Sequence, residues 1–228
     1  MKIDCHCHTI YSKHFLWGFD SLNKPRDLVK TAIKKGMDGI AVTDHDTVRG
    51  SIVTKKAAKS FKDFLVITGS EIKTSQGEIQ GLGITKNVPK GLSIDETVEK
   101  IHDLGGIAVA VHPFGSYIFR KGVEFSARKA DAIEVFNAAN LFKSSNDKAR
   151  VLARRYKKPM TAGSDAHNLR EVGNAGIICN GDPLKAIMKK NVKIYGKKNT
   201  IADMAVLTSK KFIRSAKWRI LRNRGKYI

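Results

Sequence analysis

Short apolar runs alternate with helix-like segments along most of this sequence. The runs have the length and composition of buried strands, and most segments between them are long enough to form helices. The expected strands are a first one that ends in residues 4–8, followed by 37–43, 64–68, 78–84, 107–111, 131–136, 159–162 and 192–195. The strand at 78–84 is expected to be a hairpin partner of the one before it. The expected helices are residues 25–35, 48–60, 93–105, 146–156 and 183–190.

Local signals mark several of these boundaries. Pro25 opens one helix and Gly36 ends it, and Ser93 with Glu96 forms a capping box at the start of another. A repeated βαβα pattern predicts a parallel sheet, and this many units within 228 residues predict a (β/α) barrel. We expect the barrel to occupy residues 1–198, with a separate basic extension over residues 199–228.

Polar side chains that can bind metals follow the predicted strands. In a barrel the carboxyl ends of the strands meet on one face, where active sites lie. His102 is the one histidine placed inside a predicted helix, and we interpret it as a surface or packing residue. The residues at strand ends are His6, His8, Asp44, His45, Glu71, His112, Asp165 and His167.

The first strand carries the densest group of such residues. Side chains alternate faces along a strand, so Asp4, His6 and His8 share one face while Cys5 and Cys7 share the other. Two imidazoles on one face can bind a single metal ion. The thiols point away from them, which disfavours a mixed Cys/His zinc knuckle.

Carboxylates and imidazoles without a thiolate suit Zn²⁺, Mn²⁺ or Fe²⁺. The candidate ligands are too many for one ion, so we expect two or three ions with Glu71 or Asp165 bridging them. Such clusters activate water and stabilise both oxygens of a phosphoryl transfer. Arg49 and Lys13 lie near the ligand-bearing loops and can hold phosphate oxygens, or they are solvated surface charges.

Charge and composition bound the choice of partner and compartment. The net charge of +21 favours anionic partners such as nucleic acid, phosphorylated metabolites or a membrane surface. No apolar run is long enough for stable membrane insertion, no signal peptide precedes Asp4, and three cysteines make no disulfide framework. We therefore expect a cytoplasmic protein; the oligomeric state stays open.

Five motifs in order resemble those of the PHP (polymerase and histidinol phosphatase) superfamily. The resemblance covers roughly residues 1–180 and implies a distorted (β/α)₇ TIM-like barrel that hydrolyses phosphate esters with a metal cluster at its C-terminal face. The motifs are Asp4-x-His6-x-His8-Thr9, Thr43-Asp44-His45-Asp46-Thr47, Gly69-Ser70-Glu71-Ile72, Val111-His112-Pro113 and Gly163-Ser164-Asp165-Ala166-His167.

The resemblance also implies a ligand set. His6, His8, Glu71 and Asp165 would hold one ion, and Glu71 with His112 a second. His45 and His167 would belong to a third, or one of them would protonate the leaving group.

The chain departs from the family pattern at two points. The acidic ligand of the first loop is best matched by Asp20, with His14 as a substitute. The family often places a His on the strand after the Glu motif, where this chain has Glu78 and Gln80, so Glu78 is a candidate ligand. Asn137 matches a recurring family position that is expected to support the site.

The basic extension allows two interpretations. Eight Lys and Arg residues between 208 and 228 alternate with aromatic and aliphatic ones, without an acid. A helix that packs its apolar face on the barrel is favoured over a nucleic-acid or anionic-membrane contact, because the apolar residues need burial.

The leading hypothesis is a metal-dependent phosphoesterase that acts on a nucleotide, an oligonucleotide end or a small phosphomonoester. A non-catalytic RNA-binding subunit, like the barrel protein of ribonuclease P, is an alternative that would be marked by loss of metal ligands, and this chain retains nearly all of them. A metallohydrolase of C–N bonds is a third possibility that fits the Asp165-Ala166-His167 ending less well.

Overall fold

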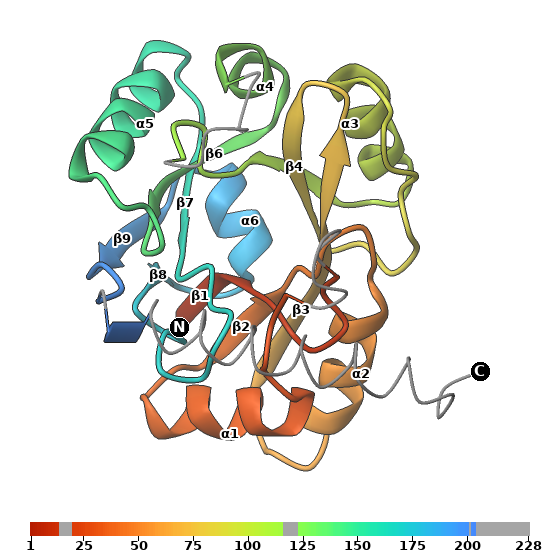
Figure 1. Ribbon diagram of the computed structural model, residues 1–228, viewed down its shortest axis with the longest axis vertical. Helices are drawn as coiled ribbons and strands as arrows, with labels where there is room; N and C mark the ends of the chain where they lie inside the picture. The colour runs from red at the N-terminus through yellow and green to blue at the C-terminus, as the bar shows by residue number, and fades with distance from the viewer. Residues whose placement is uncertain (14–19, 116–122, 201, 204–228) are drawn as a thin grey trace, which may run out of the picture.

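The computed structural model describes residues 1–13, 20–115, 123–200 and 202–203. Figure 1 shows strands at the centre with helices around them. The strands are β1 Lys2–Cys7, β2 Gly39–Val42, β3 Leu65–Thr74, β4 Gly77–Leu82, β5 Ile107–Ala110, β6 Ala132–Asn137, β7 Met160–Gly163, β8 Ala175–Cys179 and β9 Val192–Gly196. The helices are α1 Pro25–Lys34, α2 Arg49–Ala58, α3 Ile94–Asp103, α4 Val123–Lys129, α5 Lys143–Arg155 and α6 Pro183–Met188.

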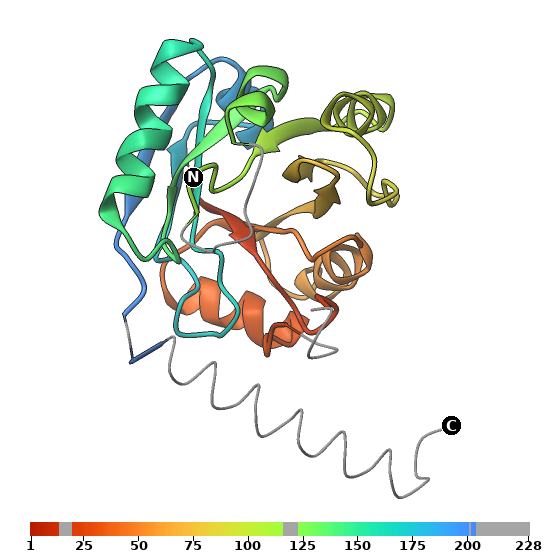
Figure 2. The same ribbon diagram turned by 45° about the horizontal axis from the view of Figure 1, so that its top comes forward.

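The nine strands form one sheet that curls into a nearly closed barrel. Their order is β7-β6-β5-β4-β3-β2-β1-β8-β9, and the helices surround the curled sheet (Figure 2). The margin strand β7 returns to β1, where Cys7 forms a parallel bridge with Ala166, just after β7. The distorted barrel expected from the sequence is therefore confirmed.

The sheet is mixed rather than fully parallel. β1–β2–β3 and β5–β6–β7 are two parallel groups, and β4 pairs antiparallel with both β3 and β5. Ser75 and Gln76 alone separate β3 from β4, and so short a connection permits only an antiparallel return. The antiparallel strand β8, between β1 and β9, and the helix α4 were not expected from the sequence.

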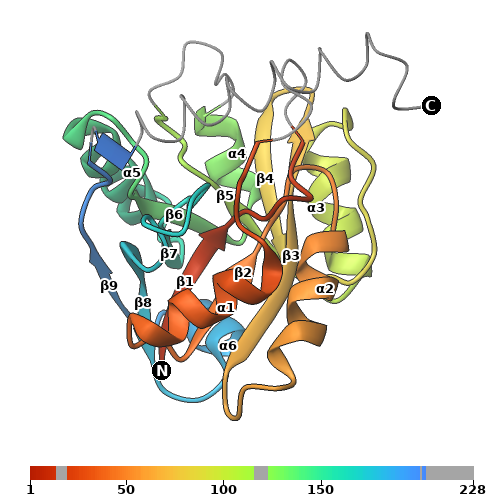
Figure 3. The same ribbon diagram turned by 60° about the horizontal axis from the view of Figure 1, so that its bottom comes forward.

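The two faces of β1 have different environments. Cys7 packs in an apolar cluster with Leu28 and Val29 of α1, while His6 and His8 on the opposite face are also fully buried. This arrangement matches the predicted alternation. Figure 3 shows β1 running away from the N-terminus and from α6, so its histidines lie at the opposite end of the barrel.

No helix in the described ranges is long and apolar enough to cross a membrane. Nearly all of the basic extension lies outside the described residues, as does His14. Packing of that extension on the barrel stays a prediction.

Gly163 allows a close approach of β7 to β1. A Cβ added there would lie 2.2 Å from the His6 Cβ and 2.7 Å from its backbone nitrogen. We predict that Gly163→Ala lowers the free energy of unfolding by about 2 kcal/mol or more, because β1 or β7 must shift. Urea denaturation measures this change.

Gly36→Ala is the control for that substitution. Gly36 has φ +67°, and nothing lies within 4 Å of an added Cβ. Its substitution therefore tests backbone strain alone, which should lower the free energy of unfolding by about 1 kcal/mol. Equal losses in the two variants would contradict the steric account.

Candidate metal centre

The imidazoles of His6 and His8 are held in fixed orientations at the end of β1. The Nδ1–H of His6 donates to the Oε1 of Glu134 at 2.9 Å, and the Nδ1 of His8 lies 3.1 Å from the Ser12 hydroxyl oxygen. These contacts turn both Nε2 atoms towards the barrel axis, where they are 3.1 Å apart. A histidine whose other ring nitrogen is anchored in this way is the usual form of a metal ligand.

Two carboxylates complete a compact group of four donor atoms. The Oδ1 of Asp165 lies 3.6 Å from the His6 Nε2 and 3.2 Å from the His8 Nε2. The Oε2 of Glu71 lies 3.4 Å and 3.3 Å from the same two nitrogens. A four-coordinate ion with bonds of about 2.05 Å separates its ligand atoms by about 3.3 Å. These side chains therefore fit a divalent ion in both chemistry and spacing.

The second oxygen of Glu71 faces another histidine. Its Oε1 is 2.7 Å from the Nε2 of His112, which is itself 3.9 Å from the Oε2 of Glu78. His6, Glu71 and His112 offer donor atoms close enough together to share an ion, as do His45, Glu71 and Glu78. Glu71 can thus bridge two neighbouring ions.

Asp20 lies between His45 and His167, the two histidines that the family resemblance assigns to a third ion. Its Oδ2 is 3.1 Å from the Nε2 of His45 and 2.8 Å from the Nε2 of His167. The side chains of His45 and His167 are 22% and 15% exposed, against 0% for His6 and His8, so they form the mouth of the site. His8, His45 and His167 form a further group that can hold an ion.

The neighbouring carboxylates raise the pKa values of the histidines in this group. Burial disfavours the imidazolium of His6, yet Asp165, Glu134 and Glu71 raise its pKa well above the usual range. Burial likewise opposes charge on His45, but Glu71 and Asp20 raise its pKa to about 9.

The pKa values of the carboxylates are shifted downwards, opposite to those of the histidines. Burial alone would raise the pKa of Asp165 and of Glu71, but the neighbouring histidines hold both well below their ordinary values. The site is therefore a set of anionic ligands that require cations, whether protons or metal ions.

Two site residues stand in an unusual backbone conformation. His112 has φ 29° and Asp165 has φ 53°, in the left-handed region that residues with a side chain rarely adopt. Such strain persists where the surroundings determine the conformation, and it clusters at functional sites. Here it turns each side chain inward directly after its strand.

Glu134 is the principal site residue that sequence reasoning missed. Besides His6, it accepts hydrogen bonds through Oε2 from the His112 backbone N–H at 2.8 Å and the Asn137 amide at 3.0 Å. Asn137 also donates to the Oδ2 of Asp165 at 3.2 Å. One buried carboxylate thus connects β1, β5 and β6, and an acid inside the apolar run 131–136 was the available signal.

Two other acids, Asp4 and Asp44, support the loops and do not belong to the groups of candidate metal ligands. Asp4 accepts hydrogen bonds from the Ser164 hydroxyl and the Gly173 N–H, which ties β1 to the segment after β7. Asp44, a strand-end acid in the sequence pattern, accepts from the backbone N–H and the hydroxyl of Thr9 at 2.6 and 2.7 Å.

Arg49 and Lys13 differ in how well they are positioned. The Arg49 guanidinium carbon lies 5.2 Å from the centre of the Tyr11 ring, in a cation–π contact that places it beside the loop after β1. Lys13 is exposed at the edge of the described part of that loop.

Comparisons with known proteins find a family model and several relatives. The family model described as PHP-associated matches residues 143–188. An uncharacterized protein of Methanocaldococcus jannaschii is 46% identical over 142 residues, which cover 60% of this chain and 82% of that protein. A 5′-3′ exoribonuclease of Haemophilus influenzae is 30% identical over 112 residues, which cover 47% of this chain and 38% of the relative.

A solved structure gives the same fold. A two-domain protein of Bacteroides vulgatus, which contains a predicted PHP-like metal-dependent phosphoesterase, aligns with a TM-score of 0.68 and 17% identity. The alignment covers 86% of this chain and 65% of that one. With its ordered motifs, its barrel and these similarities, the chain belongs to the PHP superfamily.

Proposed function

We propose that the protein is a metal-dependent phosphoesterase that hydrolyses phosphate esters with two or three divalent ions. The observation that carries this proposal is the group of four donor atoms from His6, His8, Glu71 and Asp165, spaced at 3.1–3.6 Å in each histidine–histidine and histidine–carboxylate pair. When bound, divalent ions supply activation of water and neutralisation of the phosphoryl charge.

The residues divide into three roles under this proposal. Glu71 bridges the site of His6 and His8 to that of His112, where Glu78 is a candidate further ligand. Asp20, His45 and His167 hold a third ion at the mouth. When no third ion is present, His45 or His167 can donate a proton to the leaving oxygen.

Arg49 is proposed to orient the phosphate. Its contact with Tyr11 restrains a long side chain at the edge of the site, so less conformational entropy is lost when it binds phosphate oxygens. The similarity to a 5′-3′ exoribonuclease and the net charge of +21 favour a nucleotide or oligonucleotide substrate. The full set of donors gives no support to a non-catalytic RNA-binding role.

The first test removes the β1 ligands. We expect the wild type to bind two or three equivalents of metal and to hydrolyse an aryl phosphate or a 5′-phosphorylated RNA. His6→Ala/His8→Ala should reduce hydrolysis by more than about 100-fold, since losing outer partners of metal ligands alone costs 10–100-fold. Metal analysis of the purified protein and a rate assay measure both effects.

His102→Ala is the matched control, since His102 lies on α3 with its side chain 48% exposed and paired with Asp131. It should retain metal and rate. A wild type that binds no metal and hydrolyses neither substrate would sink the proposal.

The second test addresses the positioning role of Glu134. We predict that Glu134→Gln weakens metal affinity by about 10–100-fold, because an amide cannot accept from His6, His112 and Asn137 as both carboxylate oxygens do. Competition with a chromophoric chelator measures the affinity. Unchanged affinity in a folded variant would show that this carboxylate does not orient the ligands.

The third test uses the raised histidine pKa values. Neighbouring carboxylates raise the pKa of His45 to about 9 and also raise the pKa of His6, so we expect the metal-free site to hold protons at pH 7. Metal binding must displace those protons, and metal affinity should rise as pH increases from 6 to 8. Calorimetric titration in two buffers of different ionisation enthalpy should report at least one proton released per ion, and no release would contradict the assignment.

A further inference from the structure

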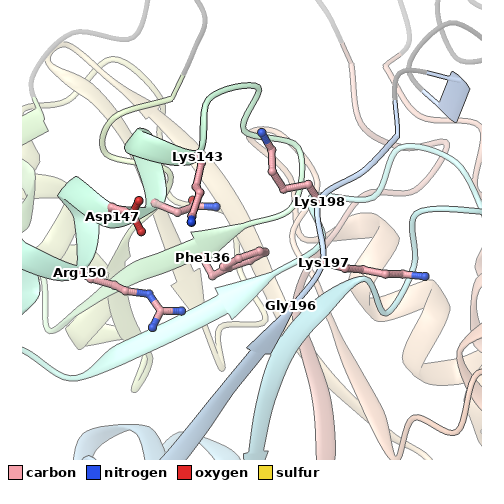
Figure 4. Close-up of a pocket in the computed structure, with 8 residues that line it drawn as sticks. Phe136, Lys143, Asp147, Arg150, Gly196, Lys197 and Lys198 are labelled. Atoms are coloured by element: carbon pink, nitrogen blue, oxygen red, sulfur yellow. The ribbon is translucent and has the colours of Figure 1, made fainter.

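A cleft outside the candidate metal centre has a lining of basic and aromatic residues. It is a cleft of about 360 Å³ between α5 and the end of β9 (Figure 4). Phe136 and Gly196 line it side by side, and a Cβ on Gly196 would lie 2.4 Å from the Phe136 Cε1. The chain therefore passes directly against the aromatic ring, which leaves an apolar lining that suits a sugar or a base.

Cations surround this lining. Lys143, Arg150, Lys197 and Lys198 line the cleft, with Asp147 as the acid among its lining residues. Lys143 and Arg150 reach from α5 towards Phe136 in Figure 4. The Lys198 ammonium donates to the Leu141 carbonyl, which holds that charge at the rim.

Among the described residues, none of these four cations forms an ion pair, although Asp147 lines the same cleft. The Lys129–Asp95 and Arg170–Asp203 ion pairs do not involve the four cations of the cleft. Unpaired cations around a concave surface focus a positive potential and attract anions. The neighbouring Phe142 is 63% exposed, which adds an aromatic face beside the charged rim.

The cleft is connected to the metal centre through a short hydrogen-bonded route. Asn146, which lines the cleft, exchanges two hydrogen bonds of 3.1 Å with the backbone of Asn137. The Asn137 amide then donates to Asp165 at 3.2 Å. One residue, Asn137, therefore stands between a residue of the cleft and a candidate ligand of the metal centre, so a long ligand can contact both places. A small phosphomonoester at the metal centre would leave the cleft unused.

We propose that this cleft binds the sugar–phosphate backbone of a single-stranded polynucleotide whose scissile phosphate occupies the metal centre. The inference rests on the proposed phosphoesterase function and narrows its substrate class. Cations that follow the backbone and aromatic faces that stack on bases are the features of proteins that bind single strands.

The test measures binding of a phosphorothioate 12-nucleotide RNA to the intact protein. Fluorescence anisotropy at several salt concentrations gives the affinity. Lys143→Ala/Arg150→Ala should weaken binding by about tenfold and reduce the slope of log affinity against log salt by about 1.4, the value for two lost phosphate contacts. Asp147→Asn should tighten binding, which keeps the test decisive if the double variant folds poorly.

Lys55→Ala/Arg128→Ala is the matched control, because it removes the same two residue types at exposed positions of α2 and α4. Equal loss of affinity in both double variants, or no binding by the wild type, would overturn the inference. Aryl phosphate hydrolysis by the wild type, measured in parallel, separates the two proposals. Hydrolysis without cleft-dependent binding refutes the cleft alone, and cleft-dependent binding without any hydrolysis refutes the phosphoesterase proposal.

Discussion

The candidate site depends on the contacts between the buried carboxylate of Glu71 and the imidazoles around it. It is 1% exposed, and its two oxygens face four imidazoles, with His6, His8 and His45 around Oε2 and His112 at Oε1. A buried carboxylate is costly unless opposite charge or hydrogen bonds compensate for it. The raised pKa values of His6, His8 and His45 favour protons that provide this compensation in the metal-free chain, and divalent ions can replace those protons. The charge of Glu71 must be balanced by the histidines around it. Under the proposed function, the protonation of these histidines and metal binding therefore depend on each other.

The barrel makes this balance possible by bringing distant segments to one end. His6 on β1 and Asp165 after β7 meet because Gly163 lets the two strands approach without a side chain between them. Glu134 then ties β1, β5 and β6 together through a single carboxylate. Antiparallel β4 joins the parallel groups β1–β2–β3 and β5–β6–β7, and antiparallel β8 pairs with the outer side of β1.

Much of this arrangement was predictable because the ends of parallel strands converge. His6, Glu71 and Asp165 follow predicted strands, and the structure brings them together as that rule requires. Glu134 could not be assigned from sequence, since its role depends on the pairing of Ala110 with Ile133, which brings it to the His112 N–H. The strand β8 was missed because residues 175–179 form a short run with a glycine, and its antiparallel pairing with β1 is set by the tertiary fold.

The central claim is that four side chains from three separate parts of the chain hold one divalent ion. Anomalous diffraction from a crystal grown with Mn²⁺ or Zn²⁺ tests it most directly. The account predicts a peak about 2.0–2.2 Å from the Nε2 atoms of both His6 and His8, and at similar distances from Glu71 and Asp165. A fully loaded crystal with no peak between those four side chains would contradict it.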